Sequence, residues 1–183
     1  SLADRYGVVL VFDEIVTGFR IANGGVQEHF GVTPDLAVFA KGVANGMPLG
    51  VYCGRAEIME KLDRAIVSST YGGEALTLAA AKACIRTYLD EPVVEHLWRM
   101  GERVWTGVEN LCKEHGVPCR MRGLWPCIQF CFDRDAADDL PARFFRAAYK
   151  HGVSLYDIPY VTYSHQDADI DDTLARMEEA VRE

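Results

Sequence analysis

The sequence predicts an α/β fold, with a mostly parallel sheet and helices followed by a small α+β domain. Two apolar runs, Val8 to Phe12 and Leu36 to Ala40, have the length and composition of strands buried on both faces of a sheet. Beyond residue 90, the pattern changes to short strand-like and helical segments in alternation. These observations place one domain at residues 1–90 and a second, small α+β domain at residues 91–183.

Composition narrows the class of protein. The chain has 183 residues, 49% of them hydrophobic and 25% charged, as expected of a globular protein with a sizeable core. The net charge of -8, with no basic stretch, argues against binding to nucleic acid. No apolar run has membrane-spanning length, and no signal-peptide pattern is present. The six cysteines form no C-x-x-C pair, which favours reduced thiols in a cytoplasmic protein and no metal site.

The first half is predicted to alternate strands, loops and helices. Gly7 ends a short helix, and a glycine-rich site loop with a helical piece near residues 27–30 follows the first strand. The expected elements after the second strand are a strand at 49–53, a helix at 55–62 and a long buried helix at 75–89.

The second half has clearer helical periodicity. Apolar residues between 94 and 111 recur at helical spacing, which predicts a helix over 93–115 with one buried face. The remaining expectations are a strand at 124–132, a helix at 143–151 stopped by Gly152, an extended segment at 153–163 interrupted by Pro159, and a helix at 166–183 capped by Asp167 or Asp169.

Charged residues follow both apolar runs. Asp13 and Glu14 follow the first, and Lys41 follows the second. Ligands of open α/β sheets bind outside the carboxyl ends of the strands. Taken alone, Asp13 could cap a loop and Lys41 could be a solvated lysine. Together they suggest pyridoxal phosphate, which needs a lysine for its Schiff base and a carboxylate at its pyridine nitrogen.

Several motifs make this chemistry specific. The segments DEIVTGFR, GGVQEHFGVTPDL, K-G-x-x-x-G-M-P-L-G and STYGGEALTLAAA, in this order, resemble class III aminotransferases, which are fold-type I pyridoxal phosphate enzymes. The glutamate-1-semialdehyde aminomutase branch and its aminotransferase relatives are the most similar. SHQDADIDDTLARMEEA is similar to the C-terminal segment of the family. The resemblance is strongest from Val8 to Ala81.

The resemblance implies that the chain is the C-terminal part of a larger enzyme. Residues 1–90 would be the second half of the cofactor-binding large domain, and residues 91–183 the small domain. The phosphate-binding turn and the aromatic residue that stacks on the cofactor ring would then lie upstream of Ser1. The resemblance also implies a homodimer whose two subunits share each active site.

The resemblance assigns roles to four residues. Lys41 matches the Schiff-base lysine and Asp13 the partner of the pyridine nitrogen. Ile15 matches the position that packs on the cofactor ring, although ordinary core packing is the alternative. Thr70 matches the threonine that contacts the cofactor phosphate of the partner subunit, and its alternative is a simple helix cap.

Other residues are given more modest roles. Glu14 is expected to be structural, and the apolar Val16 agrees with the aminomutase branch. Arg20 could bind a carboxylate or form a surface salt bridge. The free N–H groups and glycines before the helix at 75–89 predict an anion site, although relatives often have asparagine at Glu74. Two further groups are expected to be structural or to line the entry; they are Ser164 with His165, and Tyr156, Tyr160 and Tyr163.

These residues indicate a transaminase, an enzyme that moves an amino group between a small-molecule donor and a carbonyl acceptor. The aminomutase, which performs both half-reactions on one carbon skeleton, is the second hypothesis. A third hypothesis is a non-catalytic fragment that acts as an oligomerisation module, because half a cofactor site lacks its phosphate anchor. A borohydride-reducible visible chromophore would distinguish the enzymes from the fragment.

Overall fold

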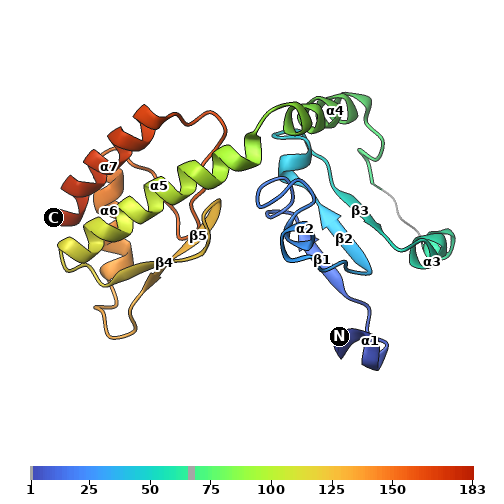
Figure 1. The fold of residues 1–183 in the computed structure, drawn as a ribbon, viewed down its shortest axis with the longest axis horizontal. Coiled ribbons are helices and arrows are strands. Elements are labelled where there is room, and N and C mark those ends of the chain that lie inside the picture. Colours follow the sequence, from blue (N-terminus) through green and yellow to red (C-terminus); the bar gives the residue numbers. More distant parts are fainter. Residues whose placement is uncertain (1, 66–68) are drawn as a thin grey trace. The chain divides into compact units, whose positions relative to one another are not determined.

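The computed structural model describes residues 2–65 and 69–183, without the side chains of residues 62 and 63 (Figure 1). The chain divides into two units, Ser1–Val94 and Glu95–Glu183. Each unit combines helices with one small sheet.

The first unit is built on a three-stranded sheet. Its strands are β1 (Val11–Glu14), β2 (Leu36–Phe39) and β3 (Val51–Gly54), in that spatial order. β1 and β2 are parallel, with Glu14 opposite Phe39. β3 returns antiparallel to β2, with Val51 opposite Phe39. β2 is therefore the central strand. Because β1 and β2 are parallel, their carboxyl ends lie at the same end of the sheet.

The first strand differs from its prediction. β1 begins at Val11 rather than Val8, and Val8 and Val9 are 60% and 53% exposed. Val11 is also exposed. Asp13, on the same face as Val11, is exposed too, whereas Phe12 and Glu14 on the opposite face are half-buried and buried. The prediction of a strand buried on both faces is therefore wrong for this chain.

Short helices connect these strands. They are α1 (Leu2–Tyr6), α2 (Val26–Phe30), the 3-10 turn η1 (Lys41–Val43), α3 (Ala56–Met59) and the 3-10 segment η2 (Glu60–Arg64). Gly7 and Gly31 follow α1 and α2 with φ of 62° and 65°, a conformation that glycine adopts without steric cost. The predicted helix at 55–62 is thus split into α3 and η2.

The last element of the first unit is the long helix α4 (Ala75–Asp90). Its position agrees with the prediction for residues 75–89, but its burial does not. Only Thr77 and Ala81 are buried in α4, whereas Leu76 and Leu89 are 65% and 73% exposed. The alanine-rich sequence supports a helix through propensity alone and leaves its packing partners unspecified.

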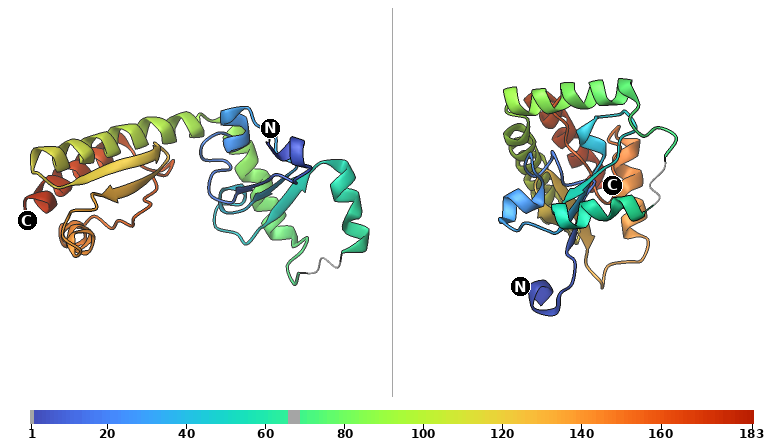
Figure 2. Two further views of the ribbon diagram at one scale, coloured as in Figure 1. Left: turned by 90° about the horizontal axis from the view of Figure 1, so that it is seen from below. Right: turned by 90° about the vertical axis from the view of Figure 1, so that its right-hand side faces the viewer.

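The second unit packs helices on a β-hairpin. Its elements are α5 (Val93–Glu114), β4 (Cys119–Leu124), β5 (Cys127–Phe132), α6 (Leu140–Lys150) and α7 (Asp167–Arg182). β4 and β5 pair antiparallel, with Leu124 opposite Cys127. α5 runs along the hairpin, and α7 lies beside α5 (Figure 2). Met100, Val104 and Val108 lie on one face of α5 and are at most 2% exposed.

Several boundaries in this unit correct the predictions. The single strand expected at 124–132 is two strands, because Trp125 and Pro126 form the turn between them. Residues 153–163 form no strand. The cap of α7 is Gln166, whose backbone N–H donates to Asp169 in a capping box. Asp169 therefore supports the cap, and neither predicted aspartate is itself the N-cap.

Candidate active site

Asp13 and Lys41 lie at the same end of the first sheet, where the carboxyl ends of β1 and β2 are found. Asp13 is near the end of β1, and Lys41 follows the end of β2 by two residues. Because β1 and β2 are parallel neighbours, their carboxyl ends open toward the same space. The side chains of both residues are exposed.

Lys41 adopts an unusual backbone conformation. Its φ is 47°, in the left-handed region that non-glycine residues rarely occupy. Its carbonyl accepts hydrogen bonds from the N–H groups of Ala44 at 3.2 Å and Asn45 at 2.8 Å. Val43 and Ala44 then pack against Ala81 of α4 in a small core. Such a conformation persists only where its surroundings hold it, and it often marks a functional position.

The residues after Asp13 form a tight turn. One carboxylate oxygen of Asp13, Oδ1, accepts a hydrogen bond from the N–H of Ile15 at 3.0 Å, and its Oδ2 remains for another partner. Ile15 and Val16 are half-buried. The turn therefore fixes one carboxylate oxygen of Asp13 and does not occupy the other.

Glu14 is fully buried and ties the next loop to the sheet. Its carboxylate accepts hydrogen bonds from the N–H groups of Val26 and Gln27, each at 3.0 Å, and from the hydroxyl of Thr17. Gly25 lies so close to the carboxylate that a Cβ there would overlap it. Glu14 thus holds the start of α2 against the end of β1 and has the structural role expected of it.

Thr70 lies in an exposed turn before α4, but it is not the N-cap of this helix. Glu74 caps α4 by accepting hydrogen bonds from the N–H groups of Leu76 and Thr77, each at 2.8 Å. The anion site predicted at this helix is therefore partly occupied by a carboxylate of the chain itself. Ser68, which belongs to the same predicted loop, lies outside the described residues.

Tyr88 and Phe19 are near the lysine turn, and sequence reasoning missed both. The hydroxyl of Tyr88 donates to the carbonyl of Gly42 at 3.3 Å. The rings of Phe19 and Tyr88 have centroids 5.2 Å apart. Burial raises the pKa of Tyr88, so its hydroxyl keeps its proton and remains a donor at neutral pH. In the sequence, Phe19 could have been associated with the site because it belongs to the DEIVTGFR motif, whereas Tyr88 lies in none of the motifs.

The family model for class III aminotransferases matches residues 1–181. The chain belongs to the class III aminotransferase family. Glutamate-1-semialdehyde 2,1-aminomutase from Rhodopirellula baltica is 30% identical over 199 residues, covering 100% of this chain and 45% of that protein. The chain thus spans about half the length of the curated relatives it matches.

Solved structures of aminotransferases have the same fold. The FumI protein of Sphingopyxis sp. MTA144, in its PLP internal aldimine form, matches with a TM-score of 0.88 and 27% identity, over 98% of this chain and 44% of that one. An omega-transaminase from Sphaerobacter thermophilus matches with a TM-score of 0.89 and 24% identity, over 99% and 45% of the two chains. The predicted family and its pyridoxal phosphate transferase fold are therefore confirmed.

The other residues noted in the sequence lie in the second unit, except Arg20, which is half-buried in the loop after β1. The Nδ1 atom of His165 accepts a hydrogen bond from the N–H of Thr162, and Tyr163 packs its ring on His96. Ser164 accepts a hydrogen bond at its carbonyl from the side chain of Gln166. These contacts stabilise the segment before α7.

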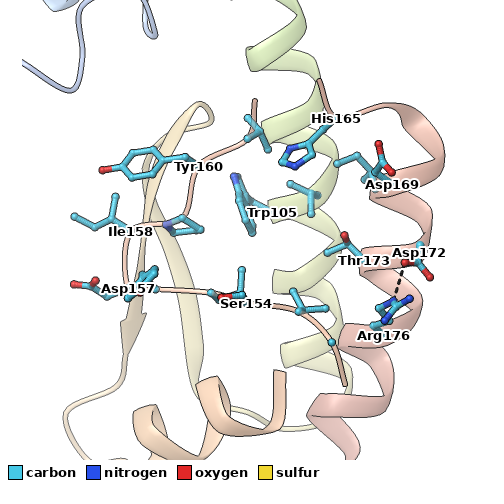
Figure 3. A pocket seen from close by; sticks show the side chains of 18 residues that line it. Trp105, Ser154, Asp157, Ile158, Tyr160, His165, Asp169, Asp172, Thr173 and Arg176 are labelled. Carbon is cyan, nitrogen blue, oxygen red and sulfur yellow. Dashed lines mark hydrogen bonds and ion pairs between the residues drawn. The ribbon is translucent and has the colours of Figure 1, made fainter. Parts of the chain in front are cut away.

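A pocket of about 900 Å³ lies in the second unit between α5, α7 and the loop after α6 (Figure 3). Tyr156, Tyr160 and His165 are among its lining residues, together with the buried ring of Trp105. Asp13, Lys41 and Thr70 are not. The described residues include no cluster of three potential metal ligands and no helix long and apolar enough to cross a membrane.

Proposed function

We propose that the chain carries the catalytic lysine and acid of a pyridoxal phosphate-dependent transaminase. The observation that supports this proposal most directly is the arrangement of Asp13 and Lys41 after two adjacent parallel strands. This cofactor requires a carboxylate for its pyridine nitrogen and an amine for its aldehyde, and the chain has one of each, both exposed, at the same end of the sheet. When bound, the cofactor supplies an electron sink for the charge that forms when a substrate Cα–H bond breaks.

Each residue has a defined task in this proposal. Asp13 would hold the pyridine nitrogen through its second carboxylate oxygen and keep that nitrogen protonated. Lys41 would anchor the cofactor through its amine and then move the substrate proton as general base and general acid. Ile15 would pack on the ring. Thr70 would hold the phosphate group of the cofactor in the partner subunit of a homodimer.

The proposal extends to the organisation of the full-length protein. Residues 1–90 form the second half of the cofactor-binding domain, and residues 91–183 form the small domain. The substrates are a small-molecule amino donor and a carbonyl acceptor, without nucleic acid or membrane partners. The six free cysteines agree with a cytoplasmic location.

The experiment uses the full-length protein with pyridoxal phosphate. We expect a visible absorption band that borohydride removes, and mass spectrometry should then find the reduced cofactor on Lys41. Lys41→Ala should lose both signals and all transamination, whereas Lys82→Ala on the exposed face of α4 should retain them. Label on another lysine, or turnover by purified Lys41→Ala, would contradict the proposal.

A second candidate is an aminomutase. The curated relative from Rhodopirellula baltica is glutamate-1-semialdehyde 2,1-aminomutase, and Val16 is apolar as in that branch. An aminomutase would convert glutamate-1-semialdehyde without an added amino donor or acceptor. A transaminase would require both. Product formation from this compound alone therefore distinguishes the two candidates.

A further inference from the structure

We propose that Tyr88 is a positioning residue for Lys41, because it holds the turn that carries the lysine against α4. This inference rests on the proposed function of Lys41. Tyr88 is remote from Lys41 in the sequence and lies near the end of α4. It does not itself reach the reacting atoms, and it acts through the backbone that follows the lysine.

The first contact is made by the phenol. The Tyr88 hydroxyl donates to the carbonyl of Gly42, the residue directly after Lys41, at 3.3 Å. A Cβ added at Gly42 would lie 3.3 Å from the Cβ of Phe19 and 3.5 Å from the Tyr88 hydroxyl. Gly42 therefore fits between these two side chains, and little space remains for the turn to shift.

Tyr88 also contacts the loop that follows β1. Its ring packs on Phe19, with centroids 5.2 Å apart and an interplanar angle of 31°. Its backbone carbonyl accepts a hydrogen bond from the side chain of Asn23 at 3.3 Å. Tyr88 thus contacts both the loop that follows β1 and the turn that follows β2.

The lysine turn needs such support because its conformation is strained. Lys41 has a φ of 47°, and only the surrounding contacts keep a non-glycine residue there. Ala81 packs on Val43 and Ala44. Tyr88 follows Ala81 by seven residues, so both lie on one face of α4. Tyr88 and Ala81 therefore contact adjacent parts of the same turn.

The contacts predict a specific defect when the hydroxyl is removed. In Tyr88→Phe the ring still packs on Phe19, so the fold is retained, but the Gly42 carbonyl loses its donor. The amine of Lys41 then samples more orientations, and proton transfer depends steeply on orientation. We expect kcat to fall about 10-fold with little change in KM.

The test compares full-length wild type, Tyr88→Phe and the matched control Tyr149→Phe, whose side chain is 73% exposed on α6. Three readouts are used: kcat and KM, the midpoint of the visible-absorption pH titration, and hydrogen exchange at Ala44 and Asn45 in the cofactor-free protein. We expect the midpoint to move and exchange to accelerate about 3-fold in Tyr88→Phe only.

The outcomes separate this inference from the proposed function. If wild type carries the cofactor on Lys41 but Tyr88→Phe matches it in titration midpoint, exchange and kcat, the positioning role is wrong. If wild type carries no cofactor on Lys41, the proposed function fails, and this inference fails with it. A change of equal size in Tyr149→Phe would also contradict the role of Tyr88.

Discussion

The buried carboxylate of Glu14 accepts a hydrogen bond from the backbone N–H of Val26 at 3.0 Å. This bond joins the end of β1 to the start of α2 across a loop of eleven residues, 15–25. The same carboxylate also binds Gln27 and Thr17. The charge of Glu14 is thus matched by three donors, which is the condition for burying it without a large cost.

Glu14→Gln should therefore destabilise the protein. The amide keeps one acceptor oxygen but turns an NH₂ donor toward backbone N–H groups that also donate. We expect a loss of about 2 kcal/mol in the free energy of unfolding, measured by urea denaturation. The control is Glu28→Gln, in an exposed residue that accepts a hydrogen bond from Gly24. Equal stability of the two variants would show that Glu14 does not hold the loop.

Asp13→Asn tests the proposed acid. Asparagine keeps an oxygen for the N–H of Ile15, so the turn after β1 should be preserved. It cannot keep a pyridine nitrogen protonated by charge, and we expect kcat to fall at least about 100-fold. Steady-state kinetics on the full-length protein measure this loss, while cofactor absorption should persist. A variant with wild-type kcat would remove Asp13 from the chemistry.

Glu74→Gln should change stability in a pH-dependent way. The side-chain hydrogen bond of Thr77, and then the N–H groups of Thr77 and Leu76, lower the pKa of Glu74 from its ordinary value of 4.5. A lowered pKa in the folded state means that the stabilisation is present above pH 4.5 and is lost as the pH falls through the folded pKa.

Thermal unfolding from pH 7 to pH 3 measures this effect. Wild type should melt above Glu74→Gln at neutral pH, and the difference should shrink on acidification because protonated glutamate resembles glutamine. A difference independent of pH would mean that the charge of the cap contributes nothing.

Gly101→Ala should destabilise the second unit, although alanine is the better helix former. A Cβ at Gly101 would overlap the backbone carbonyl of Trp125 in the hairpin turn, which cannot rotate away. We expect a loss of about 1–3 kcal/mol. Gly107→Ala, also in α5, faces only the movable end of the Leu174 side chain and should cost less. Thermal melting of both variants distinguishes steric strain from helix propensity. If propensity alone decided stability, both variants would melt above the wild type.

Local patterns predicted most elements in order, apart from the β4–β5 hairpin and the division of the helix at 55–62 into α3 and η2. The apolar runs located β1 and β2 to within a few residues, and helical spacing located α5 almost to its ends. The acid and the lysine were visible because they follow those runs directly. Such features depend on neighbouring residues in the chain, which the sequence records without ambiguity.

The sequence by itself determined the family, the two strands and the candidate pair Asp13 and Lys41. Only the tertiary structure decided that Glu74 caps α4, that one face of β1 is exposed and that Tyr88 reaches Gly42. Burial depends on which strands and helices become neighbours, and a hydrogen bond depends on where two groups meet in space. Neither relation is encoded in the periodicity of a single segment.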